Sequence, residues 1–254
     1  MFAFLQFLNV GLSFAPSSLL DPPFMNRYFL GLLLLISSLL ARAQTKPADK
    51  VKVKYAYALY LPKDYQATKR SYPLLIYLHG GSQRGNDLTK LQEYGPPQLV
   101  HQGKDFPFLI ASPQCPDGKY WSSDNWFDLL YTELLTKYRI DPKRVYLTGI
   151  SMGGYGTWQT AVAYPDKFAA ILPLCGGCDD STQICRIKKV PVWTFHGTAD
   201  DKVPFGLTDR LVKHLRACPG KDQVRFTQLV NEGHEIQYLY HQKKLYRWLL
   251  KQHK

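Results

Sequence analysis

The sequence predicts an α/β fold in which helices cover both faces of a mainly parallel, doubly wound sheet. Short apolar runs alternate along the chain with longer segments of helical period. Most of these runs are apolar without interruption, which is typical of strands that are buried on both faces in a parallel sheet. Hydrophobic residues make up 45% of the chain and aromatic residues 14%, enough for a sizeable core.

The expected strands follow from these runs. Residues 51–61 alternate between apolar and other side chains, which predicts a half-buried, antiparallel strand near the start of the sheet. Central strands are predicted at 74–78, 106–111, 145–148, 169–174, 190–195 and 226–230.

Helical periodicity predicts the elements between and after these strands. Helices are expected at 125–138, 152–164, 205–217 and 235–251. The longest stretches without periodicity are residues 82–97 and 114–123. Loops of this length usually shape a functional site.

The N-terminal residues 1–43 are predicted to be an extension and a signal peptide. Arg27 precedes an apolar stretch at 28–40, and Ala41-Arg42-Ala43 then offers a small-x-small cleavage site. The apolar stretch is shorter than the roughly 20 residues that a spanning helix needs. We therefore expect Met25 to be the start, cleavage after Ala43, a secreted or periplasmic product without stable membrane insertion, and one domain over 47–254.

The formal charge of +12 and the isoelectric point of about 9.4 raise the question of an acidic partner. Lysines and arginines are scattered along the chain and form no dense block with interleaved aromatic residues. Nucleic-acid binding is therefore not expected.

The five cysteines would meet an oxidising compartment in an exported protein. Their odd number leaves at least one unpaired. A short-loop disulfide between Cys178 and Cys185 is the first expectation, although sequence alone does not fix the connectivity. Cys175 and Cys178 form a lone C-x-x-C without a second ligand pair, so no metal site is expected.

A candidate nucleophile lies at residues 149–153, Gly-Ile-Ser-Met-Gly, between a predicted strand and a predicted helix. A serine on such a tight turn needs small residues two positions before and after it, and Gly149 and Gly153 satisfy this need. The turn exposes the hydroxyl of Ser151, and the helix start directs backbone N–H groups at charge that develops on an attacked carbonyl.

A serine nucleophile requires a base and a group that orients the base. Asp200 follows one predicted strand and His234 follows the next, at the strand ends where open parallel sheets collect their ligands. We assign Asp200 as the acid and His234 as the base. Asp201 remains the alternative acid.

An oxyanion requires at least two preorganised donors. Residues 78–82, Leu-His-Gly-Gly-Ser, end an early strand, and their glycines allow close backbone approach. We expect the N–H groups of Gly81 and Met152 to form this site and His79 to fix the loop. No catalytic role is expected for the remaining histidines, which are His101, His196, His214, His241 and His253.

These motifs resemble the exported esterase and predicted-peptidase branch of the α/β-hydrolase superfamily, which includes relatives of dienelactone hydrolases, acyl-protein thioesterase-like carboxylesterases and feruloyl esterases. The resemblance rests on residues 78–85, 112–116 and 141–154 and on the loops that carry Asp200 and His234. It implies an α/β-hydrolase fold and a triad hydrolase with no cofactor and no large inserted lid. The chain departs from these relatives around Cys178 and Cys185, where they carry a plainer Gly-rich turn. The resemblance therefore does not predict the pocket wall near these residues.

The substrate follows less directly from the sequence. Trp121, Trp126 and Tyr155 lie in or near loops expected to face the site and can stack on a sugar or an aromatic acyl group. The expected substrate is a small-molecule or polysaccharide-linked ester, including acyl groups on plant polysaccharide. A serine peptidase of the prolyl-oligopeptidase type is the alternative enzyme, and a binding module on a hydrolase scaffold is the non-enzymatic alternative.

Overall fold

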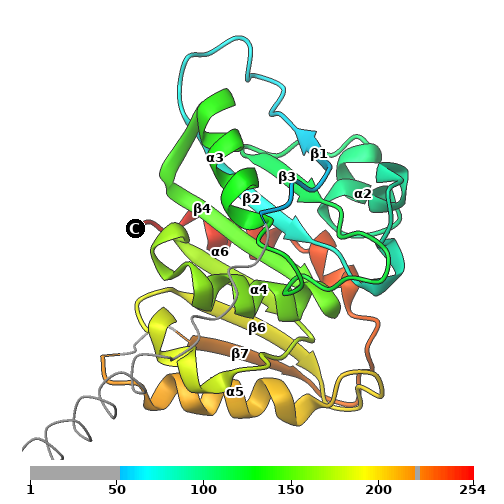
Figure 1. Ribbon diagram of the computed structural model, residues 1–254, viewed down its shortest axis with the longest axis vertical. Helices are drawn as coiled ribbons and strands as arrows, with labels where there is room; N and C mark the ends of the chain where they lie inside the picture. Colours follow the sequence, from blue (N-terminus) through cyan, green and yellow to red (C-terminus); the bar gives the residue numbers. More distant parts are fainter. Residues whose placement is uncertain (1–51, 221–223) are drawn as a thin grey trace, which may run out of the picture. The chain divides into compact units, whose positions relative to one another are not determined.

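The computed structural model describes residues 52–220 and 224–254 (Figure 1). The predicted signal peptide lies outside these residues. The described residues form a seven-stranded sheet in the order β1-β3-β2-β4-β5-β6-β7. Strand β1 pairs antiparallel with β3, and all other neighbours run parallel. The strands are β1 (Tyr57–Tyr60), β2 (Tyr72–Leu78), β3 (Leu109–Pro113), β4 (Ile140–Ile150), β5 (Ala170–Leu174), β6 (Val192–Gly197) and β7 (Val224–Leu229).

Helices cover both faces of the sheet, as the sequence predicts for this fold. The helices are α2 (Pro96–His101), α3 (Phe127–Lys137), α4 (Met152–Ala163), α5 (Phe205–Ala217) and α6 (Lys243–Leu250). One hydrophobic cluster contains residues of α3, α4 and α5, and the other contains residues of α2 and α6. In Figure 1, α4 accordingly lies in front of the sheet and α6 behind it.

The strand order brings the predicted site residues to one edge. Ser151 follows β4 directly, Asp200 lies in the turn after β6, and His234 lies in the loop after β7. Because these strands are parallel, their carboxyl ends meet at the same edge of the sheet.

The structure corrects several predicted elements. The helix predicted at 235–251 is divided into the 3-10 turn η5 (Gln237–His241) and α6, and the strand predicted at 106–111 begins at Leu109. The loop predicted at 82–97 contains the 3-10 turns η1 (Gly81–Gln83) and η2 (Leu88–Gln92) and the start of α2.

The predicted disulfide between Cys178 and Cys185 is wrong. Cys185 pairs instead with Cys218, and their Cα atoms lie 5.5 Å apart. The 3-10 turn η4 (Ser181–Ile187), which carries Cys185, packs on α5, and Cys218 follows directly after this helix. The thiol of Cys178 is 3.4 Å from the carbonyl oxygen of Asp180.

None of the helices within residues 52–220 and 224–254 has the length and apolar character needed to cross a lipid bilayer.

Candidate active site

Ser151 occupies a strained backbone turn between β4 and α4. Its φ is 56° and its ψ is −119°, values that L-residues with a side chain rarely adopt. The Ser151 N–H donates to the carbonyl of Leu174 at 3.0 Å and thereby ties the turn to the neighbouring strand β5. Such strain persists only where the surrounding structure enforces it, and it is common at functional sites.

The glycines two positions before and after Ser151 allow this turn to pack directly on the backbone of β2. A Cβ atom at Gly153 would lie 1.9 Å from the carbonyl oxygen of Leu78, and one at Gly149 would lie 2.3 Å from the oxygen of Gly153. No side chain fits at either position, which is the physical reason for the Gly-x-Ser-x-Gly pattern.

His234 lies between Ser151 and Asp200. Its Nε2 atom is 2.8 Å from Ser151 Oγ, and its Nδ1 atom is 2.8 Å from Asp200 Oδ2. Because an ionised carboxylate only accepts hydrogen bonds, Nδ1 donates to Asp200, and Nε2 is left to accept the proton of the Ser151 hydroxyl. This is the arrangement in which an imidazole can act as a general base toward a serine.

The carboxylate of Asp200 is held by the turn in which it lies. Its Oδ1 atom accepts the backbone N–H groups of Lys202 at 2.9 Å and Val203 at 2.8 Å. Burial raises the pKa of Asp200, but the N–H of Val203, the hydrogen bond with His234 and the N–H of Lys202 outweigh it, so that the pKa lies below its ordinary value. The carboxylate is therefore ionised at neutral pH.

Asp200, and not Asp201, is the carboxylate beside His234. The Asp200 side chain is 0% exposed, whereas that of Asp201 is 71% exposed and pairs with Lys202 at 3.3 Å.

The loops that carry Asp200 and His234 are joined backbone to backbone. A Cβ atom at Gly197 would lie 2.3 Å from the carbonyl oxygen of Glu232. The N–H of Ala199 donates to the same oxygen at 2.9 Å, and the N–H of Asn231 donates to Thr198 Oγ1 at 2.8 Å. These contacts fix the separation of Asp200 and His234.

His79 fixes the loop that contains Gly81. Its Nδ1 atom lies 2.6 Å from the carbonyl oxygen of Gly80, and its Nε2 atom lies 3.0 Å from the backbone nitrogen of Cys115. Nδ1 therefore donates and Nε2 accepts, which requires a neutral ring. Burial lowers the pKa of His79 to about 4, in agreement with this state.

The hydrogen bond to the Gly80 carbonyl also orients the next amide. The C=O and N–H of one trans peptide point in opposite directions, so the Gly81 N–H points away from the His79 ring. Met152 is the first residue of α4, and its N–H belongs to those that have no acceptor within the helix. Both residues line cavities that reach Ser151.

Two cavities meet at Ser151. The first, of about 470 Å³, has an aromatic wall that contains Tyr120, Trp121 and Tyr155. The second, of about 350 Å³, is more polar, and His234, Ser82, Tyr94, Glu235 and Gln237 are among the residues that line it.

Two of the three predicted substrate-contacting aromatic residues line the first cavity, and Trp126 does not. Trp126 is 2% exposed and lies behind Trp121, with its Nε1 atom donating to the Trp121 carbonyl at 2.9 Å. Trp121 in turn donates from Nε1 to the His79 carbonyl at 3.2 Å. The structure therefore gives Trp126 a supporting position behind the cavity wall.

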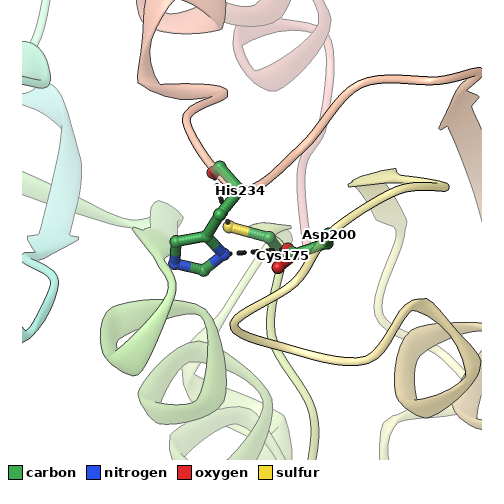
Figure 2. Close-up of side chains that lie close together, drawn as sticks. All are labelled: Cys175, Asp200 and His234. Atoms are coloured by element: carbon green, nitrogen blue, oxygen red, sulfur yellow. Dashed lines mark hydrogen bonds and ion pairs between the residues drawn. The ribbon is translucent and has the colours of Figure 1, made fainter.

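Cys175 lies beside the acid and the base (Figure 2). Ligand atoms of Cys175, Asp200 and His234 lie within 4.8 Å of one another, close enough to hold a metal ion. The closeness is explained by the Asp200–His234 hydrogen bond and by the packing of the thiol 3.8 Å from the His234 carbonyl oxygen. Burial raises the pKa of Cys175, which favours a protonated thiol over a metal-binding thiolate.

Sequence reasoning missed two residues that contact this machinery. The hydroxyl of Tyr94 accepts the Gly80 N–H at 3.2 Å. His196, for which no role was expected, lies with Nε2 at 3.1 Å from Asp200 Oδ2. Its position four residues before Asp200, at the end of a buried strand, was the available signal for His196, whereas nothing in the loop sequence distinguishes Tyr94.

Sequence comparison relates the chain to ester hydrolases. The sequence pattern of the phospholipase/carboxylesterase family matches residues 121–245. A bifunctional acetylxylan esterase/xylanase of Neocallimastix patriciarum is 28% identical over 158 residues, which cover 59% of this chain and 23% of the relative. The poly(3-hydroxyalkanoate) depolymerase C of Paucimonas lemoignei is 27% identical over 153 residues, which cover 54% of this chain and 34% of the relative. The chain thus spans about a quarter to a third of the length of these curated relatives.

Solved structures show the same fold. A thermostable esterase superposes with a TM-score of 0.66 at 32% identity, over 78% of this chain and 59% of that one. A ferulic acid esterase superposes with a TM-score of 0.55 at 20% identity, over 79% of this chain and 95% of that one, and this likeness concerns the fold alone.

Proposed function

Because this chain matches the phospholipase/carboxylesterase family over residues 121–245 and has the fold of solved esterases, we propose that it is an exported serine esterase that uses Ser151, His234 and Asp200. The observation that carries the proposal is the pair of 2.8 Å contacts of His234, one to Ser151 Oγ and one to Asp200 Oδ2.

The proposed reaction passes through an acyl-enzyme. Ser151 Oγ attacks the ester carbonyl while its proton moves to Nε2 of His234, and Asp200 stabilises the resulting imidazolium. The N–H groups of Gly81 and Met152 bind the oxyanion of the tetrahedral intermediate. Collapse breaks the ester C–O bond, and His234 gives its proton to the departing alcohol. Water then attacks the acyl-serine carbonyl while His234 takes its proton. Collapse of the second tetrahedral intermediate releases the carboxylic acid and returns the proton to Ser151 Oγ.

The positions of the two cavities suggest which part of the ester occupies each. The alcohol must leave on the side where His234 can protonate it, because the same Nε2 atom acts as general acid. His234 lines the polar cavity and is not among the residues that line the aromatic one. We therefore place the alcohol in the polar cavity and the acyl group in the aromatic cavity.

The chemistry of each cavity supports an acylated carbohydrate as the substrate class. Tyr120 and Tyr155 offer accessible rings that can stack on a flat acyl group, and Trp121, which is only 3% exposed and is held from behind by Trp126, forms part of the cavity wall. Ser82, Glu235 and Gln237 offer polar groups to a hydroxyl-rich alcohol. An acyl group on plant polysaccharide, feruloyl or acetyl, satisfies both requirements.

The disulfide between Cys185 and Cys218 supports the proposed export. Structural disulfides persist in the periplasm and outside the cell and are rare in the reducing cytosol. We therefore propose a secreted or periplasmic location, to be checked by mapping the N-terminus of the exported product against the expected start at Gln44.

Hydrolysis of a panel of acetyl, butyryl, long-chain and feruloyl esters, with one peptide anilide, tests the activity. We expect ester turnover that falls at least about a thousandfold in the Ser151→Ala variant. The exposed Ser71 provides the matched control, because Ser71→Ala leaves the site untouched. A folded protein that cleaves the anilide and none of the esters would support a peptidase, and one that cleaves nothing would support a binding module.

A further inference from the structure

The carboxylate of Asp200 lies between two imidazole rings. Its Oδ2 atom is 2.8 Å from His234 Nδ1 and 3.1 Å from His196 Nε2. Both Asp200 and His196 have fully buried side chains. The general base therefore shares its carboxylate oxygen with a second histidine that the reaction described above does not use.

The contacts of His196 Nε2 show which atom carries the proton. Besides Asp200 Oδ2, this nitrogen faces the carbonyl oxygen of Val203 at 2.9 Å. A carbonyl and a carboxylate only accept hydrogen bonds, so Nε2 must bear a hydrogen to satisfy either of them.

The other ring nitrogen is held from α5. His196 Nδ1 lies 2.7 Å from Thr208 Oγ1, which itself lies 2.5 Å from the carbonyl oxygen of Gly176. Thr208 has one hydroxyl proton. In the structure it is directed at the Gly176 carbonyl oxygen. A neutral ring with its hydrogen on Nε2 requires this proton to turn to Nδ1, whereas a protonated ring donates from Nδ1 and leaves the hydroxyl bonded to Gly176.

The surroundings favour the neutral ring. Burial lowers the pKa of His196, against the opposing effect of its hydrogen bonds to Val203 and Asp200. The titratable groups that face the ring are Asp200, from the turn after β6, and His234, from the loop after β7. From α5 the ring meets the uncharged Thr208 and Phe205.

We propose that His196 is a positioning residue that donates from Nε2 to Asp200 Oδ2. This hydrogen bond holds the oxygen against Nδ1 of His234 and stabilises part of its negative charge. The inference rests on the proposed triad. Its consequence is that Asp200 stabilises the imidazolium of His234 less strongly than an unshared carboxylate would.

The first test measures the tautomer and needs no activity. Nitrogen-15 NMR of the histidine side chains in the wild-type protein at pH 7 is expected to show His196 protonated at Nε2 and bare at Nδ1. The opposite tautomer would overturn the proposal, because Nε2 would then have no hydrogen to donate. A wild-type protein that hydrolyses no ester but shows the expected tautomer would sink the proposed function and leave the hydrogen on Nε2, which the proposal needs, established.

The second test compares two substitutions by the pH dependence of kcat/KM. His196→Leu removes the donor, and we expect kcat/KM at its optimum to fall about tenfold to a hundredfold, the range for a lost hydrogen bond to a charged group. We also expect the acidic limb to move to higher pH by about half a unit or more, since Asp200 then holds the His234 proton more strongly. His196→Gln restores an amide N–H and is expected to bring the limb back toward that of the wild type.

Controls separate positioning from general loosening. The exposed His214 lies on α5 away from the triad, and His214→Gln is expected to leave both the rate and the limb unchanged. An equal loss of activity at every pH in both His196 variants, with an unmoved limb, would refute the proposal. If His196→Leu does not fold, His196→Ala replaces it, and its limb is compared with that of His196→Gln in the same way.

Discussion

Asp200 and Asp201 are neighbours in the chain with opposite surroundings. One carboxylate is buried against His234 and two backbone N–H groups, and the other lies in solvent beside Lys202. We expect Asp200→Asn to lower kcat by about ten thousandfold, because an amide at this position favours the wrong tautomer of the base. Asp201→Asn is the matched control and is expected to retain activity. Steady-state kinetics on one ester settle the assignment, and equal losses in the two variants would contradict it.

His79 makes stability depend on pH. Its pKa is lowered to about 4 by burial, below that of an exposed histidine in the unfolded chain. Between these two pKa values the unfolded state binds a proton that the folded state does not. The contribution of His79 to the free energy of unfolding is therefore fully present above the unfolded pKa and is lost as the pH falls toward 4.

The expected size of this effect is roughly 2 to 3 kcal/mol between pH 7 and pH 4.5. Urea denaturation at the two pH values measures it. His79→Asn keeps a donor near Gly80 and cannot titrate, so its loss of stability on acidification should be smaller by this amount. The pKa of His196 is lowered as well, so the stability of the variant still depends on pH to some extent. An equal loss of stability on acidification in the variant and the wild type would show that His79 does not contribute to the pH dependence.

Local spacing predicted the tight turn at Ser151 and the positions of Asp200 and His234, because all three lie in short motifs beside strand ends. Burial separated Asp200 from Asp201, and no motif could report burial. His196 and Tyr94 were missed for a related reason. Both lie near their partners in the chain, His196 four residues before Asp200 and Tyr94 fourteen residues after Gly80, but each contact depends on how the loop between the two residues folds, which no motif reports.

At the scale of elements, α4 is held against β2 by contacts that leave no room for a methyl group. A Cβ atom at Gly153 would meet the backbone oxygen of Leu78, which cannot move without displacing its strand. Gly153→Ala is therefore expected to destabilise the protein by about 3 kcal/mol or more, with loss of esterase activity.

Gly206 offers the control within a helix. A Cβ atom there would meet only the end of the flexible Arg210 side chain at 3.2 Å. Gly206→Ala should be neutral or stabilising by up to about 1 kcal/mol, because alanine favours the helix. Thermal unfolding of the two variants measures the difference, and similar shifts in Tm would refute the packing argument.

Periodicity predicted the existence of the strands and most of the helices, and it was weakest at their ends. Strand β4 extends back to Ile140 through polar residues that an apolar run does not mark. Helix α2 begins with two prolines, which mask its short helical character. The break between η5 and α6 at Gln242 leaves no trace in the helical period.

For the whole molecule, the disulfide joins segments that are 33 residues apart. Replacing Cys185 or Cys218 by serine is expected to lower the free energy of unfolding by about 2 to 4 kcal/mol, because the unfolded chain gains the freedom of an open loop. Cys178→Ser is the control, since this thiol is free. Denaturation with and without a reducing agent measures the loss, and a non-reducing peptide map that joins Cys178 to Cys185 would contradict the pairing.

The backbone junction at Gly197 has a consequence for heating. The loops that carry Asp200 and His234 meet there without intervening side chains, and the Ser151 turn hydrogen-bonds to β5, so we expect these segments to unfold together with the sheet. The residual rate at each temperature should then follow the fraction of native molecules, and inactivation and unfolding curves should superimpose. A protein built this way is expected to keep its full activity up to the temperature of cooperative unfolding. The upper limit of its activity is then set by the thermal stability of the sheet.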